Sequence, residues 1–250
     1  MLFLYLYLIT ISFNLFSCSS IFFHADEVDR YEINFHDKKS LLISFGDGCS
    51  IATSIKQMGY RVAAFPFDWI VSNFEKIDLL LSNNFVYLFD PLYLMPSIRF
   101  PNCLENTLYD IHFAHDFPTN VDKENPFGII VPNWIDFLEE VARKYQKRIQ
   151  RFRSLANYKG KIYFLHNNLY KRGELNEVII KKIQERLFEI FPLVDFELLF
   201  FIEHGLSLDI KNLSNVRVVK TKHLGCPTSI QNISNEFRSC LESLGFLLEA

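Results

Sequence analysis

The spacing of hydrophobic residues changes along the chain, from short apolar runs to longer amphipathic ones. "SLLISFG" (residues 40–46) is a short apolar run, which predicts a buried strand. Apolar residues then recur at helical spacing from Ile51 to Met58, and Gly59 supplies a stop for the predicted helix. A strand followed directly by a helix is typical of a parallel sheet that is covered by helices.

The same alternation continues toward the carboxyl terminus, around a less regular stretch at residues 91–132. Further strands are predicted at "RVAAF", "FVYLFD", "KIYFLHN", "FELLFFIEH" and "VRVVKTK". Amphipathic helices are predicted at residues 73–83, 134–155, 174–191 and 229–248. We therefore expect residues 38–250 to form a single α/β domain, a three-layer Rossmann-like arrangement with a mainly parallel sheet.

The first 23 residues form a separate hydrophobic segment. They carry no charged side chain, and the first charges after them are the acidic Asp26 and Glu27. This pattern predicts an N-terminal signal peptide or membrane anchor at residues 1–23, and hence an exported or membrane-anchored protein of a secretory or periplasmic compartment. The alternative interpretation is a hydrophobic first strand packed into the domain.

Composition narrows the classes of partner. The chain has 250 residues, of which 49% are hydrophobic and 22% charged, enough for one sizeable core. A net charge of -3 gives no general attraction to nucleic acid, so we expect no nucleic-acid partner. The five cysteines include no CxxC pair and no Cys/His ligand spacing. The sequence therefore predicts neither a metal site nor a cofactor.

Cys49 is the first candidate for chemistry, because it lies where the first predicted strand passes into its helix. In an open α/β sheet the loop after a strand lies at the ligand-binding edge, and the amides of the next helix favour a thiolate. Gly46 and Gly48 would let the backbone turn sharply and approach a ligand. The alternative is a small apolar side chain that only fills space.

A thiol nucleophile requires a base, and His115 is the strongest candidate among seven histidines. It opens "HDF" in the irregular stretch, and Asp116 beside it could orient the imidazole. Asp116 could instead cap a turn. Asp68 in "FPFDWI" is the other candidate acid, and its alternative role is a helix N-cap or an acceptor for a backbone N–H.

These segments together resemble a known family. "LLISFGDGCSIATSIKQMGYRVAAFPFDWI", "YDIHFAHDF", and "KRIQRF" followed by "KIYFLHN" are similar to the papain-like cysteine peptidases grouped as DUF1796, over about residues 41–167. The resemblance implies Cys49 as nucleophile, His115 as general base, and Asp116 or Asp68 as the third member. Trp69, in the "PFDW" motif, is expected at the ligand site. A papain-like fold differs from the parallel sheet that the periodicity predicts.

A basic helix supports a different class of function. Arg148 and Arg151 are three residues apart and could grip a phosphate or carboxylate on one helix face. That would suit a glycosyltransferase-like protein binding an anionic glycan or nucleotide-sugar without a covalent step. No Gly-rich phosphate loop accompanies the helix, and a solvated face balanced by Glu139 and Glu140 is the simpler interpretation. A binding module with an aromatic groove between Phe85 and Phe117 is a third possibility. The substrate, peptide or glycan, is left open.

Overall fold

A computed structural model describes residues 39–168, 174–203, 208, 210, 213–221 and 230–243 of the chain. The predicted signal or anchor at residues 1–23 lies outside these residues. Within the described ranges, no helix has both the length and the apolar character needed to cross a membrane.

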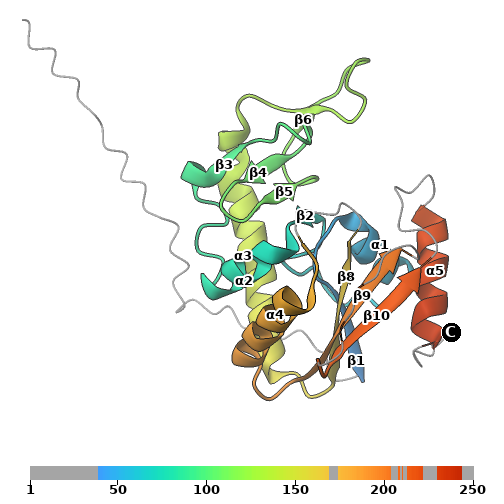
Figure 1. The fold of residues 1–250 in the computed structure, drawn as a ribbon. Helices are drawn as coiled ribbons and strands as arrows, with labels where there is room; N and C mark the ends of the chain where they lie inside the picture. Colours follow the sequence, from blue (N-terminus) through green and yellow to red (C-terminus); the bar gives the residue numbers. More distant parts are fainter. Residues whose placement is uncertain are drawn as a thin grey trace, which may run out of the picture.

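Four strands form a parallel sheet at the centre of the fold (Figure 1). They are β1 (Ser40–Ser44), β8 (Lys161–Asn167), β9 (Asp195–Glu203) and β10 (Val216–Thr221), and they lie in the order β1-β8-β9-β10. Every neighbouring pair is parallel. The predicted α/β class with a parallel sheet is thereby confirmed. The carboxyl ends of all four strands meet at one edge, where parallel sheets place their ligand sites.

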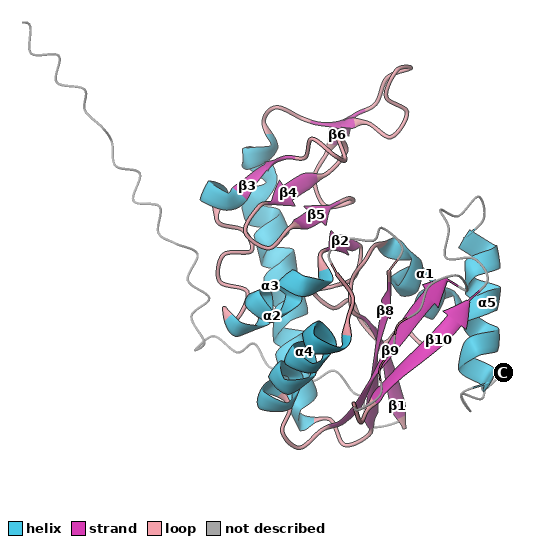
Figure 2. Ribbon diagram, viewed as in Figure 1, coloured by secondary structure: helices cyan, strands magenta, loops and turns pink. Residues whose placement is uncertain are grey.

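Helices cover both faces of this sheet (Figure 2). On one face lie α1 (Cys49–Gln57) and α5 (Ile230–Ser243), which also contact each other. On the other lie α2 (Phe74–Ser82), α3 (Leu138–Ser154) and α4 (Glu177–Ile190). The predicted helices at these positions are confirmed, and the ends of α1, α2, α3 and α4 differ from the prediction by a few residues, which is the usual uncertainty of helix boundaries. Both ends of the helix predicted at 229–248 lie outside the described residues.

Side chains alternate between the two faces of the sheet along β8, so this one strand contributes to two separate hydrophobic clusters. Phe164 packs with Phe152 and Phe191 on the α3 and α4 side. The next residue, Leu165, points to the opposite face and joins the cluster that contains Phe237 of α5. Because successive side chains of a strand point to opposite faces, a strand buried on both sides appears as a continuous apolar run. "KIYFLHN" has this pattern.

A second sheet is antiparallel and comes from the stretch whose pattern was irregular. It contains β2 (Ile70–Ser72), β5 (Ile111–Phe113), β4 (Leu104–Asn106) and β3 (Leu94–Pro96), in the order β2-β5-β4-β3. A two-stranded sheet follows, made of β6 (Thr119–Asn120) and β7 (Ile129–Ile130). Short 3₁₀ helices lie at Pro91–Tyr93, Trp134–Phe137 and Leu155–Asn157. Such short strands carry too few residues for a clear period.

The strands predicted at "RVAAF" and "FVYLFD" are wrong. Residues 61–65 form no strand, because their backbone groups make hydrogen bonds to side chains instead of to a neighbouring strand. The Ala64 carbonyl accepts from Arg151, and the Phe65 amide donates to Asp68. Residues 85–90 form turns, since Asn84 and Phe85 both have positive φ. Apolar side chains in these segments still enter the core. Their hydrophobicity therefore indicates burial, although the backbone forms no hydrogen bonds to a neighbouring strand in the described part of the chain.

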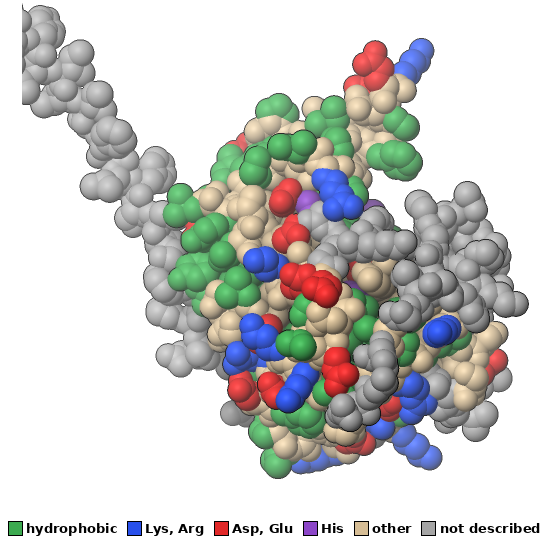
Figure 3. All heavy atoms as spheres, in the orientation of Figure 1, with side chains coloured by type: hydrophobic (Ala, Val, Ile, Leu, Met, Phe, Trp, Pro, Cys, Tyr) green, Lys and Arg blue, Asp and Glu red, His purple; other side chains and the backbone are tan. Residues whose placement is uncertain are grey.

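Charged side chains of both signs are mixed over the face seen in Figure 3, which agrees with the small net charge of the chain. Where ion pairs form on exposed positions, as between Arg143 and Glu139 on α3, they contribute little to stability.

Candidate active site at the carboxyl edge of the parallel sheet

Cys49 is the first residue of α1, as the strand-to-helix pattern predicts. Pairing with β8 continues one residue beyond β1, since the Phe45 amide donates to the Leu165 carbonyl at 2.8 Å. Gly46, Asp47 and Gly48 then have φ of 87°, 65° and 102°. Three consecutive residues in the left-handed half of φ space reverse the chain sharply. Their turn carries the thiol to the carboxyl edge of the sheet.

The close approach of Gly46 to the neighbouring strand β2 makes a side chain impossible there without movement. A Cβ on Gly46 would lie 2.1 Å from the Ser72 Oγ. The same Ser72 hydroxyl accepts from the Asp47 amide at 3.1 Å, and the Gly48 amide donates to the Ile70 carbonyl at 2.6 Å. The turn before Cys49 is therefore held against β2 by two hydrogen bonds.

The environment of the thiol combines partial exposure with a helix N-terminus. Cys49 is half-buried, and none of the three described cysteines (Cys49, Cys103 and Cys240) forms a disulfide. Gly48 is the N-cap of α1 and has no side chain that could accept from the first-turn amides. Amides at a helix start carry a partial positive charge and favour an anion nearby. This arrangement can stabilise a thiolate or a developing oxyanion.

His115 lies on the other side of the beginning of β2. Ile70, whose carbonyl bonds Gly48, is paired with Phe113, two residues before His115. The His115 ring is exposed and meets the Trp69 ring edge-on, with 6.3 Å between the ring centres. The turn of Cys49 and the segment of His115 are thus brought to the same short stretch, Trp69 and Ile70, although 65 residues separate them in the sequence.

The two candidate acids have structural partners. Asp116 accepts from the Tyr145 hydroxyl at 2.7 Å and pairs with Lys144, both on α3. Asp68 is buried and accepts from Arg61 at 2.9 Å and from the Phe65 amide at 3.2 Å. Asp68 therefore has the backbone-acceptor role that the sequence analysis gave as its alternative. Burial raises the pKa of Asp68, and the charge of Arg61 opposes that shift.

Trp69 contacts both Arg61, which pairs with Asp68, and His115. It has a φ of 68°, unusual for a side chain of this size, and Arg61 lies over its ring at 5.2 Å. Its other neighbour is His115. A backbone strained in this way persists only where surrounding contacts hold it, and such residues concentrate at functional sites.

The two arginines proposed to grip an anion both turn toward the protein. Arg148 is buried, lies over the Tyr145 ring at 4.6 Å, and faces the charge of Asp68. Arg151 donates to the Ala64 carbonyl at 3.2 Å. These contacts attach residues 61–69 to α3. The interpretation as a solvated helix face holds for Arg143 and Glu139, but not for Arg148.

Sequence reasoning missed polar residues at the end of β8. The Asn167 amide donates to the Ser50 hydroxyl at 2.6 Å, so it joins the first turn of α1 to the neighbouring strand. His166 points to the opposite face of the sheet, where its Nδ1 lies 3.1 Å from the Phe45 carbonyl and its ring packs on Phe74. The polar "HN" that ends an apolar strand was the available signal.

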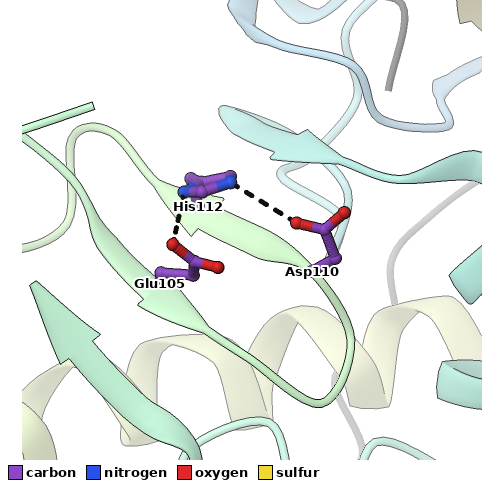
Figure 4. A group of neighbouring side chains, drawn as sticks. All are labelled: Glu105, Asp110 and His112. Carbon is purple, nitrogen blue, oxygen red and sulfur yellow. Dashed lines mark ion pairs between the residues drawn. The ribbon is translucent and has the colours of Figure 1, made fainter. Parts of the chain in front are cut away.

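Residues that could hold a metal ion gather elsewhere. Among the described residues, Glu105, Asp110 and His112 form the one group of three or more histidine, cysteine or acidic side chains with ligand atoms close enough for an ion. The group lies on the antiparallel sheet (Figure 4). The carboxyl edge of the parallel sheet offers a thiol, an imidazole and backbone amides, a set suited to nucleophilic rather than metal-assisted chemistry.

Comparison with known proteins agrees with the motifs. Residues 40–205 match the model of the family described as "Putative papain-like cysteine peptidase (DUF1796)". A mimivirus protein, "Uncharacterized protein R408" of Acanthamoeba polyphaga mimivirus, is 26% identical over an alignment of 166 residues, and the alignment covers 59% of this chain and 70% of the viral protein. No solved structure matches the chain significantly.

Proposed function

The chain belongs to the DUF1796 family, and from this premise we propose that it is a thiol-dependent hydrolase with Cys49 as nucleophile and His115 as general base. The observation that carries the proposal is the position of Cys49, as the first residue of α1 at the carboxyl edge of a parallel sheet. In this position the helix amides lower the free energy of the thiolate, which is the attacking form of cysteine.

The proposed reaction has two halves. His115 takes the proton of Cys49, and the sulfur attacks the carbonyl carbon of the substrate while N–H groups at the start of α1 bind the developing oxyanion. The leaving group receives that proton from His115 as the bond to it breaks. Water, deprotonated by His115, then attacks the thioester, and the product acid leaves as the thiol regains its proton.

Asp116 fits a positioning role better than that of a third member touching the imidazole. Its carboxylate is held by Tyr145 and Lys144 on α3, so it ties the loop after His115 to the largest helix of the fold. Trp69 borders the ring of His115 itself. We infer that these two residues limit the orientations open to His115, while Asp68 supports the segment that carries Trp69.

Thiol reactivity tests the proposal, with Cys240 and Cys103 as internal references. Cys240 is half-buried like Cys49 but lies within α5, and burial raises the pKa of Cys103 to about 12. At pH 6 we expect iodoacetamide to modify Cys49 at least roughly tenfold faster than Cys240, measured by mass spectrometry of the peptides, because Cys49 lies at a helix N-terminus and Cys240 lies within α5. Cys103 should react most slowly.

The role of His115 requires a variant. His115→Ala is expected to slow the modification of Cys49 and to leave the rate at Cys240 unchanged, because only Cys49 would lose a proton acceptor. Equal rates at Cys49 and Cys240 in the unaltered protein would overturn the thiolate proposal. An unchanged Cys49 rate in His115→Ala would remove His115 as the base.

The substrate class, the detailed architecture and the localisation are proposed from the sequence alone. We propose a peptide or glycan substrate, a three-layer Rossmann-like arrangement, and export or membrane anchoring through residues 1–23. The alternative of an anionic glycan or nucleotide-sugar ligand is favoured less by the geometry, because Arg148 and Arg151 have contacts inside the protein.

A further inference from the structure

A second polar cluster lies on the antiparallel sheet, around the middle residue of β5. His112 of β5 is directly opposite Glu105 of β4, and Asp110 immediately precedes β5. One ligand atom from each of these three residues lies within 4.8 Å of the other two. Figure 4 shows the imidazole between the two carboxylates. Side chains opposite each other in neighbouring strands are held at contact distance by the sheet itself.

The buried imidazole is the feature that needs an explanation. His112 is only 1% exposed, and neither ring nitrogen makes a hydrogen bond. Its ring packs edge-on against Phe100, with 4.9 Å between the ring centres. Burying a polar group without a partner is costly, and native proteins contain few such groups. Both ring nitrogens of this one residue are without a hydrogen bond, which points to a ligand rather than a local packing defect.

The carboxylates are near the ring but too far to satisfy it. Nδ1 of His112 lies 3.6 Å from Glu105 Oε2, and Nε2 lies 3.6 Å from Asp110 Oδ1. Charge-assisted N–H···O bonds are shorter, about 2.7–2.9 Å. In contrast, two atoms bound to one tetrahedral zinc ion are roughly 3.4 Å apart, given metal–ligand bonds of about 2.0–2.2 Å. The separation of 3.6 Å is therefore closer to that of two metal ligands.

We propose that Glu105, Asp110 and His112 form a binding site for a divalent transition-metal ion. Zn²⁺ is the ion whose size and preferred ligands fit these residues best. Nε2 of His112 and Oδ1 of Asp110 bind the ion directly. Glu105 either completes the ligand set through a side-chain rotation or accepts a hydrogen bond from Nδ1–H. The second arrangement is the common carboxylate–histidine–metal relay, which fixes the ring orientation.

The neighbours of the cluster favour Asp110 as a ligand. Its second oxygen, Oδ2, accepts from the Asn73 side chain at 2.9 Å, so Oδ1 is held toward His112. Ligating carboxylates are commonly hydrogen-bonded in this way. Asn73 is also the N-cap of α2, which connects the site to the helical layer. A bound ion would thus join β4, β5 and the start of α2.

The donor set also selects the class of ion. An imidazole nitrogen suits Zn²⁺, Fe²⁺, Ni²⁺ or Cu²⁺, whereas Mg²⁺ and Ca²⁺ prefer sites made of oxygen atoms. Two carboxylates balance the charge of a divalent ion. The sequence predicts no metal site because it contains no CxxC pair and no Cys/His ligand spacing. Here the ligands are seven residues or fewer apart but meet through a strand pairing.

Zinc binding to the full-length protein tests this inference independently of the proposed hydrolase. We expect one Zn²⁺ per chain to bind in competition with a chromophoric chelator and to raise the thermal unfolding temperature, because an ion that binds only the native state stabilises it. His112→Gln should weaken this binding by at least roughly tenfold, and an excess of Mg²⁺ should not compete.

Two further variants separate this site from other sources of zinc binding. Glu105→Gln changes a partly exposed side chain, so it provides a second test if His112→Gln fails to fold; it should weaken binding also. Cys49→Ala removes the thiol of the candidate active site and should keep the wild-type affinity. Equal affinities in wild type, His112→Gln and Glu105→Gln would overturn the proposal, as would the absence of saturable binding to the wild type.

Discussion

Replacing Gly46 by alanine is expected to lower the free energy of unfolding by about 3 kcal/mol. The residue has a φ of +87°, which L side chains rarely adopt, and the added Cβ would lie 2.1 Å from the Ser72 Oγ. Moving Ser72 aside would also break its hydrogen bond from the Asp47 amide. Urea unfolding of the purified variant, followed by circular dichroism, measures the loss.

Gly59 provides a matched control for this prediction. It has a φ of +77°, but a Cβ there would meet no atom within 4 Å. Gly59→Ala should therefore cost only the strain of the backbone, about 1 kcal/mol. The double variant Gly46→Ala with Ser72→Gly should recover part of the loss of Gly46→Ala, since it removes the atoms that clash. If Gly46→Ala and Gly59→Ala lowered the free energy of unfolding equally, the close approach of the Cys49 turn to β2 would be refuted.

Acid should destabilise the protein through His166. This side chain of β8 is buried against the rings of Phe74 and Phe200, and burial lowers its pKa from 6.5 to about 4. Between these pH values the unfolded chain binds a proton that the native protein does not. The stability that His166 contributes is therefore complete above pH 6.5 and is lost as the pH falls toward 4. The difference between the two pKa values corresponds to about 3 kcal/mol of folding free energy, at 1.36 kcal/mol per pH unit.

The contribution of His166 can be separated from that of the carboxylates by substitution. Asparagine can place an amide near the position of Nδ1 and still donate to the Phe45 carbonyl, but it does not titrate. His166→Asn should therefore lose less stability than the wild type between pH 7 and pH 4.5, measured by urea unfolding at both values. His115→Asn, a change on an exposed loop, should keep the wild-type difference. A wild-type difference retained in His166→Asn would show that another group is responsible.

The proposed thiol hydrolase site and the proposed metal site lie on different four-stranded sheets. Cys49 and the amides of α1 lie at the edge of the parallel sheet, and His112 lies within the antiparallel one. The strand β2 connects the two, because Ile70 contacts the Cys49 turn and Val71 pairs with His112. An ion that stabilised β5 would thereby also support the strand against which the Cys49 turn is packed.

Local patterns in the sequence were sufficient for the main elements of the fold and for the position of Cys49. A buried strand, a glycine-rich turn and an amphipathic helix follow from residues near each other in the chain, so β1 and α1 could be predicted with the thiol at the start of the helix. The long periods of α3 and α4 are local in the same sense. These predictions needed no knowledge of what packs against what.

Tertiary structure alone decided which polar side chains meet. Asp116 was predicted beside His115 because the two are adjacent in sequence, yet its carboxylate reaches Tyr145 on a remote helix. Arg148 was assigned to a ligand or to solvent, but the packing of α3 on residues 61–69 buries it. Glu105 and His112 face each other only because β4 and β5 pair in one register. Hydrophobic period is set by backbone geometry within a segment, whereas side-chain partnership depends on how segments pack, which no local pattern encodes.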